Sequence, residues 1–62
     1  MNPEVKKLID SKVKKMGRYF KEIEVLNRNR FKCLGYDGSI HKVVVTDNYF
    51  MSVDGEAKCF ID

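Results

Sequence analysis

Short turn sequences divide the chain after residue 18 into segments of strand length. Asp37-Gly38 and Asp54-Gly55 are strong two-residue hairpin turns, and Asp47-Asn48 is a good one. A looser turn lies at residues 27–29. Because each turn reverses the chain tightly, the sequence predicts five antiparallel strands that follow one another as a meander. Their expected ranges are 19–26, 30–36, 39–46, 49–53 and 56–61.

The segment before these turns predicts a helix over residues 3–16. Asn2 suits the N-cap, and Pro3 suits the first helical position, where a backbone N–H would have no partner. We expect Gly17 to end the helix in the left-handed conformation. Apolar residues recur at helical spacing on one side of this segment: Val5, Leu8, Ile9, Val13 and Met16. The expected fold class is therefore α+β, an N-terminal helix packed on a curved five-stranded antiparallel meander.

The small size of the chain limits the core that it can build. Its 62 residues, 44% of them hydrophobic, correspond to a single domain over 1–62. A chain of this length buries only about 60% of the surface that its unfolded form exposes. We therefore expect a marginal core, which a second subunit would supplement.

The hairpin turns also predict which residues face each other. A two-residue loop at Asp37-Gly38 pairs Leu34 with His41, and one at Asp47-Asn48 pairs Val45 with Phe50. One face of the central strands then collects Phe31, Cys33, Ile40, Val44, Met51 and Val53. The other face collects Leu34, Tyr36, Val43, Val45, Phe50, Ala57, Cys59 and Ile61.

In this register both faces of the sheet are apolar, although one helix can cover only one of them. Either the sheet curls into a small barrel, or its uncovered face is buried against a second copy or another protein. We favour a strongly curved sheet with a homodimer contact. The candidate partner-binding residues on the uncovered face are Leu34, Tyr36, Val43, Val45 and Phe50.

Charge is distributed unevenly along the chain. Residues 1–32 hold ten basic and four acidic residues, a formal charge of +6, whereas residues 33–62 carry −3. The candidate basic patch consists of Lys7, Lys14, Lys15, Arg18, Lys21, Arg28, Arg30 and Lys32. Such asymmetry fits an acidic protein surface or a nucleic acid as partner, and it equally fits a hydrated helix face.

No motif in the sequence indicates catalysis or a cofactor. His41 is the only histidine, and Cys33, His41 and Cys59 do not have the spacing of a zinc site. Because the sequence has no export signal and no apolar run of membrane-spanning length, we expect a cytoplasmic protein with reduced cysteines and no membrane contact. We expect no enzyme, no cofactor and no metal.

Two functions remain after catalysis is set aside. The first is a non-enzymatic protein-interaction module, a small regulator or inhibitor that docks through an apolar sheet face with a basic rim. It explains the surplus apolar face and the polarised charge together. The alternative is a small nucleic-acid-binding protein that uses the basic helix and the first hairpin. Its stacking residues would be Tyr19, Phe20, Phe31 and Tyr36.

Overall fold

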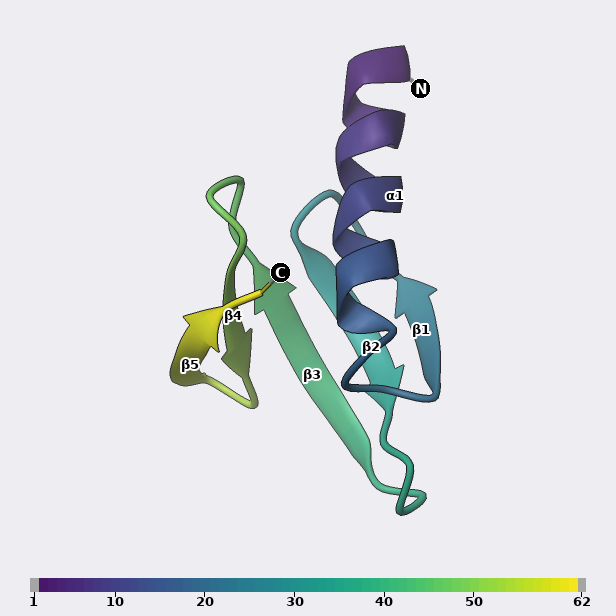
Figure 1. The fold of residues 1–62 in the computed structure, drawn as a ribbon, viewed down its shortest axis with the longest axis vertical. Coiled ribbons are helices and arrows are strands. Elements are labelled where there is room, and N and C mark those ends of the chain that lie inside the picture. Colours follow the sequence, from purple (N-terminus) through teal and green to yellow (C-terminus); the bar gives the residue numbers. More distant parts are fainter. Residues whose placement is uncertain (1, 62) are drawn as a thin grey trace.

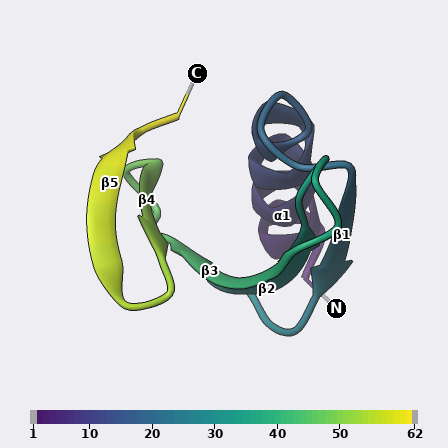
Figure 2. The same ribbon diagram turned by 90° about the horizontal axis from the view of Figure 1, so that it is seen from below.

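A computed structural model describes residues 2–61 as one helix followed by five strands (Figure 1). These are α1 (Pro3–Met16), β1 (Glu22–Val25), β2 (Arg30–Leu34), β3 (Ile40–Val45), β4 (Phe50–Val53) and β5 (Glu56–Phe60). All five strands belong to one antiparallel sheet, in which they lie in chain order. The structure therefore confirms the α+β meander. The sheet is curved and does not close into a barrel (Figure 2).

Helix α1 has the predicted bounds, but its end differs from the prediction. At the start, the Glu4 N–H donates to the Asn2 side-chain oxygen at 2.8 Å. At the end, Gly17 has φ −58° and ψ −17°, so the predicted left-handed cap is wrong. Instead, the N–H groups of Tyr19 and Phe20 both donate to the Met16 carbonyl, at 2.9 and 3.1 Å. A tight turn thus satisfies the helix end without positive φ.

The β2–β3 hairpin has a longer loop than predicted. Gly35 N–H donates to the Ser39 carbonyl at 2.7 Å, and Gly38 N–H donates to the Gly35 carbonyl at 3.0 Å. Gly38 takes φ +88°, while no positive φ occurs at Tyr36 or Asp37. This is a three-residue loop, in which a right-handed turn is followed by one left-handed residue. Cys33 consequently lies opposite His41, so the predicted pairing of Leu34 with His41 is wrong.

The β3–β4 hairpin repeats this departure, whereas the last hairpin follows the prediction. Thr46 N–H donates to the Phe50 carbonyl at 3.0 Å, and Tyr49 takes φ 63° at the third loop position. Val45 therefore lies opposite Met51 instead of Phe50. Asp54 and Gly55, by contrast, have φ values of 53° and 85° and form the predicted two-residue turn.

Because both loops are longer than predicted, the β3 residues predicted for one face of the sheet lie on the other. A shift of one residue moves every side chain of a strand to the opposite face. Val43 and Val45 therefore lie on the side of the helix and are fully buried, which corrects their prediction as partner-binding residues. Ile40 and Val44 lie on the outside and are exposed. The residues of the core are Ile9, Met16, Phe20, Phe31, Cys33, Val43, Val45, Met51 and Ile61.

The curvature of the sheet brings the helix between its two ends. Figure 2 shows α1 on the concave side, with β1 beside it and the β4–β5 hairpin across from it. The hydroxyl of Tyr49, in the β3–β4 loop, donates a hydrogen bond to Ser11 Oγ of the helix at 3.2 Å. We call the concave side the inner face and the opposite side the outer face. The single helix covers only the inner face.

Candidate functional site

The outer face of the sheet carries apolar side chains that the chain itself does not cover. Ile40 is 62% exposed, Phe60 is 68% exposed, and Val44 is 38% exposed. Leu34 and Phe50 also lie on this face and are half-buried. Clustered apolar side chains in water are typical of surfaces that bind another molecule. The outer face is therefore the leading candidate for a functional surface.

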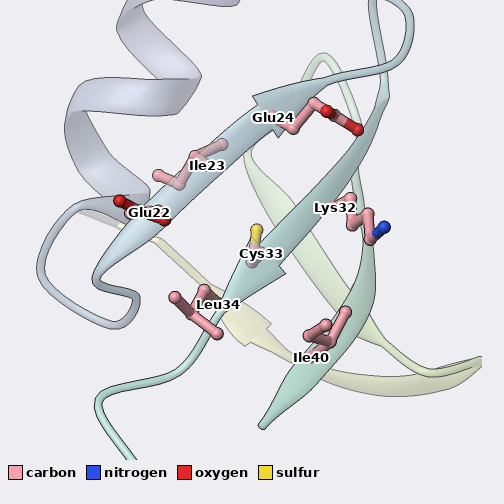
Figure 3. Close-up of a pocket in the computed structure, with 7 residues that line it drawn as sticks. All are labelled: Glu22, Ile23, Glu24, Lys32, Cys33, Leu34 and Ile40. Atoms are coloured by element: carbon pink, nitrogen blue, oxygen red, sulfur yellow. The ribbon is translucent and has the colours of Figure 1, made fainter. Parts of the chain in front are cut away.

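An open groove of about 540 Å³ crosses the outer face at β1, β2 and the start of β3 (Figure 3). Its lining residues are Glu22, Ile23, Glu24, Lys32, Cys33, Leu34 and Ile40. Ile23 and Cys33 alternate with the outward residues and send their side chains into the core, so they contribute the backbone of the floor. The groove therefore combines an apolar pair, Leu34 opposite Ile40, with charged residues of both signs.

The charges of the groove have no ion-pair partner among residues 2–61. Glu24 lies directly opposite Lys32, and Lys32 lies directly opposite Lys42 on the next strand. Nevertheless, no salt bridge joins Glu22, Glu24 or Lys32 to another described residue. The predicted rim was basic, whereas the structure places two acidic residues on β1 beside the basic residues of β2 and β3. The outer face thus presents both signs of charge.

A second apolar cluster lies at the other end of the outer face. The Phe50 and Phe60 rings meet edge to face, with centroids 5.0 Å apart. Strand β5 is exposed along its whole length and forms one edge of the sheet. Cys59 on this strand is an exposed free thiol. The outer face therefore has two apolar ends, separated by the charged row of Glu24, Lys32 and Lys42.

The predicted partner-binding residues fall into three groups. Leu34 and Phe50 lie on the outer face, as expected for a docking surface. Tyr36 is exposed in the β2–β3 loop, where its hydroxyl donates to the Gly17 carbonyl at 3.2 Å. Val43 and Val45 lie in the core. The prediction missed Ile40, Val44 and Phe60, although the spacing of Gly35 and Gly38 was a signal for a three-residue loop.

The predicted basic patch is not continuous. Arg30 and Lys32 project from the outer face, whereas Lys7, Lys14, Lys15 and Arg18 belong to the helix side. Lys21 is exposed just before β1. Ser11, Lys14, Lys15 and Arg18 line a shallow depression of about 310 Å³. The Lys15 ammonium also lies 5.3 Å from the centre of the Tyr49 ring.

Arg28, the remaining member of the patch, belongs to a structural clamp that the sequence did not indicate. The clamp is centred on Lys12, a helix residue with no exposed surface. Its ammonium donates to the Arg28 carbonyl at 3.2 Å, to Asn29 Oδ1 at 2.8 Å and to Asp47 Oδ1 at 3.0 Å. Three acceptors match its three protons, so no buried donor is left unpaired.

Asp47 completes the clamp by pairing with two cations. The Arg28 guanidinium forms a salt bridge with its other carboxylate oxygen. Hydrogen bonds from Arg28, and then from Lys12, lower the pKa of Asp47 below its usual value. The clamp joins α1 to the β1–β2 and β3–β4 loops, and we interpret it as a stabilising feature of the fold.

His41 forms hydrogen bonds in an order that resembles a catalytic triad. Ser39 Oγ lies 2.8 Å from His41 Nε2, and His41 Nδ1 lies 2.8 Å from Asp54 Oδ2. However, Ser39 Oγ also lies 2.5 Å from Asp37 Oδ1, which can only accept. The hydroxyl has one proton, and donating it to Asp37 leaves none for His41 to remove. The arrangement therefore does not activate Ser39 as a nucleophile.

The His41 bonds tie two hairpin ends together. The pKa of Asp54 is lowered, first by the hydrogen bond from His41 and then by the backbone N–H of Lys42. The pKa of Asp37 is lowered by hydrogen bonds from the Ser39 hydroxyl and backbone. These residues link the β2–β3 loop to the β4–β5 turn, and we interpret the chain of bonds as a second structural clamp.

Cys33 gives no sign of a reactive or metal-binding role. Burial raises the pKa of its thiol to about 11, so the thiol stays protonated at neutral pH. Within residues 2–61, no three His, Cys, Asp or Glu side chains lie close enough together to hold a metal ion. The helix formed by residues 3–16 is too short and too polar to cross a membrane.

Similarity to known proteins does not help to assign a function to this surface. Comparisons of the chain with protein-family models, with curated proteins and with solved structures found no match.

Proposed function

We propose that this protein is a non-enzymatic protein-interaction module that docks through the outer face of its sheet. The observation that carries the proposal is the exposure of Ile40, Val44 and Phe60 on a face that the helix leaves uncovered. Burying such side chains against a partner is favourable, because it removes apolar surface from water. Charged residues around them would supply specificity and orientation.

The form of the surface favours a regulatory role. An interface needs an apolar centre and a polar rim, and it needs no reactive group. Leu34 and Ile40 form such a centre beside Glu22, Glu24 and Lys32. A module of this size can act by covering the site of a larger protein, as a regulator or inhibitor does. We place it in the cytoplasm, where Cys33 and Cys59 would remain reduced.

Photo-crosslinking from two exposed positions tests this proposal. A crosslinking amino acid replaces Ile40 on the outer face in one protein and Lys6 on the helix in the control. Both proteins are irradiated alone and in an extract of the producing cells. We expect discrete protein–protein products from position 40 only, and competition by unlabelled wild-type protein but not by the Ile40→Asp variant. Equal products from both positions, or none from position 40, would overturn the proposal.

Nucleic-acid binding is a second candidate, favoured by the depression on the helix. Lys14, Lys15 and Arg18 surround it, and none of them pairs with a carboxylate among residues 2–61. Three cations without counter-charges could contact phosphates. The first hairpin would contribute less to nucleic-acid binding than expected, because Arg28 forms a salt bridge with Asp47.

Titration with single-stranded and duplex oligonucleotides over a range of salt concentrations tests the second candidate. Phosphate contact by Lys14 predicts that Lys14→Gln lowers affinity for all sequences and reduces the salt slope by about one. Lys6→Gln serves as the control. Affinity that does not depend on Lys14, or absence of binding at low salt, would remove this candidate.

A further inference from the structure

We infer that the second structural clamp is sensitive to pH: it is complete while His41 carries a proton on each ring nitrogen, and it breaks when the ring becomes neutral. The clamp consists of Asp37, Ser39, His41 and Asp54. His41 lies near the start of β3 and connects the β2–β3 loop to the β4–β5 turn. The inference does not depend on the proposed function, because it concerns only these hydrogen bonds.

The Asp54 end of the clamp requires a proton on His41 Nδ1. This nitrogen lies 2.8 Å from Asp54 Oδ2, and the Lys42 N–H donates to Asp54 Oδ1 at 2.9 Å. Both bonds lower the pKa of Asp54, so at neutral pH it is a carboxylate that can only accept hydrogen bonds. His41 Nδ1 is therefore the donor.

The Ser39 end of the clamp requires a proton on His41 Nε2. Ser39 Oγ lies 2.5 Å from Asp37 Oδ1 and 2.8 Å from His41 Nε2. Hydrogen bonds from the Ser39 hydroxyl and backbone lower the pKa of Asp37, so this carboxylate also only accepts. If the hydroxyl gave its single proton to His41, two oxygens would lie 2.5 Å apart with no proton between them. Ser39 therefore donates to Asp37 and accepts from Nε2.

Both ring nitrogens are thus donors, and a histidine with two donor nitrogens carries a positive charge. A hydrogen bond to a carboxylate is stronger than one to a neutral hydroxyl, so the ring gives up its Nε2 proton first. Nε2 then becomes an acceptor. Either its bond to Ser39 is lost, or the Ser39 hydroxyl turns from Asp37 to Nε2. In both cases one bond of the clamp breaks.

The titratable and charged groups around His41 determine the direction of this change. They are Cys33 on β2, Asp37 in the β2–β3 loop, Lys42 on β3 and Asp54 in the β4–β5 turn. Cys33 lies directly opposite His41, but burial raises the pKa of its thiol to about 11, so it is uncharged. The Phe20 ring, 6.1 Å away between centroids, has no charge. The complete clamp holds one proton more than the broken one, so raising the pH breaks it.

The clamp holds the β2–β3 loop against its own backbone. A Cβ added at Gly35 would lie 2.8 Å from Asp37 Oδ1 and 3.1 Å from Ser39 Oγ, so both side chains pack directly on this glycine. The His41 side chain is 31% exposed, which lets water exchange its proton. Loss of that proton therefore loosens Asp37 and the loop around it.

Nuclear magnetic resonance of ¹⁵N-labelled protein tests the inference from about pH 5 to about pH 9, which covers the range in which a histidine ordinarily changes charge. His41 is the only histidine, so its ring signals are unambiguous. We expect two protonated ring nitrogens at the acidic end and the Nδ1–H form at the alkaline end. The backbone amide signals of Asp37 and Ser39 should shift with the same midpoint as the ring. The amide signal of Asn48, in the β3–β4 loop, should not.

Two variants interrupt the clamp without touching the His41–Asp54 bond. Ser39→Ala removes the hydroxyl between His41 and Asp37, and the Asp37 amide should lose its shift while the ring still reaches the Nδ1–H form. Gly35→Ala places a methyl group against Asp37 Oδ1 and should cause the same loss. Ser11→Ala is the matched control, because it removes a hydrogen-bonded serine hydroxyl on the helix, and it should keep the shift.

Several results would overturn the inference. They are a neutral ring protonated at Nε2, a ring that keeps one charge state over the whole range, and an Asp37 amide that does not follow the ring. A folded Ser39→Ala protein that keeps the coupling would overturn it as well. Dispersed amide signals show that a variant is folded, and if Ser39→Ala is unfolded, the wild-type titration and Gly35→Ala decide. Crosslinking from position 40 tests the proposed function separately.

Discussion

The two faces of the sheet are built from the same few strands, but one is covered by the helix and the other is exposed. On the inner face, Phe31, Val43 and Val45 pack under the helix and are fully buried. On the outer face, Ile40 and Val44 alternate with charged residues and lie in water. Neighbouring residues of β3 thus belong to the core and to the surface in turn. The difference teaches that burial in the core and exposure at the surface are assigned residue by residue along one strand.

The largest expected effect contrasts two phenylalanines on opposite faces. Phe31 has no exposed surface, whereas Phe60 is 68% exposed. Phe31→Ala should lower the free energy of unfolding by about 3–5 kcal/mol, because it leaves a cavity in the core. Phe60→Ala should cost only about 1 kcal/mol, chiefly from the lost edge-to-face contact with Phe50. Urea unfolding of both variants measures the contrast, and equal costs would break the distinction between the faces.

The next effect concerns the clamp that fixes the helix over the inner face. Lys12→Ala removes three hydrogen bonds and the packing of a buried side chain, and it should cost on the order of 2–3 kcal/mol. Lys12→Met keeps most of the packing and should cost less, because a similar apolar shape can replace a buried charge. Thermal melts of both variants measure this, with Lys7→Met as an exposed control near zero. A Lys12→Ala protein as stable as the control would contradict the clamp.

A smaller effect tests the loop that sets which residues belong to each face. Gly38 has φ +88°, and no atom lies near the position of an added Cβ, so Gly38→Ala meets backbone strain without a clash. We expect a loss of about 1–2 kcal/mol. Gly17→Ala is the matched control, because φ −58° suits alanine, and it should be neutral or stabilising by up to about 1 kcal/mol. A neutral Gly38→Ala, measured by chemical unfolding, would indicate a different loop and register.

The smallest effect is the dependence of stability on acidity. Asp37, Asp47 and Asp54 each have a pKa lowered by hydrogen bonds in the folded state. Their stabilisation is therefore present above the ordinary carboxyl pKa of about 3.9 and is lost as pH falls through the lower folded values. The midpoint of thermal unfolding should fall between about pH 5 and pH 2. Asp54→Asn should flatten this fall, and an unchanged slope would show that the His41 bonds contribute nothing.

Most of the fold could be predicted from local sequence signals, each of which involves only a few residues. Asn2 and Pro3 start the helix, and Asp54-Gly55 forms the predicted turn. The register of β3 did not follow, because Asp37-Gly38 and Asp47-Asn48 both fit inside three-residue loops as well as two-residue turns. A change of one residue in loop length moves every side chain of the next strand to the opposite face. The prediction therefore placed Val43 and Val45 on the uncovered face.

The candidate site was harder to predict than the fold, because it depends on contacts distant in sequence. Leu34 and Phe50 lie on the uncovered face, as predicted, whereas the exposure of Ile40 and Phe60 on that face was not predicted. Lys12 resembled its exposed neighbours in the sequence, and only the meeting of two loops with the helix gives it acceptors. Alternation within a strand predicts that faces differ, but the tertiary structure decides which face is covered.

Labelling of cysteines introduced at two β3 positions, one on each face of the sheet, tests the central claim most directly. Ile40→Cys and Val43→Cys are made in a Cys59→Ser background that keeps the buried Cys33. The rate of thiol alkylation at each position is followed by peptide mass spectrometry, with and without an extract of the producing cells. The account predicts rapid labelling at position 40 in the free protein, protection of position 40 in the extract that holds the binding partner, and slow labelling at position 43 throughout. Rapid labelling at position 43 in folded protein, or equal labelling at position 40 under every condition, would contradict it.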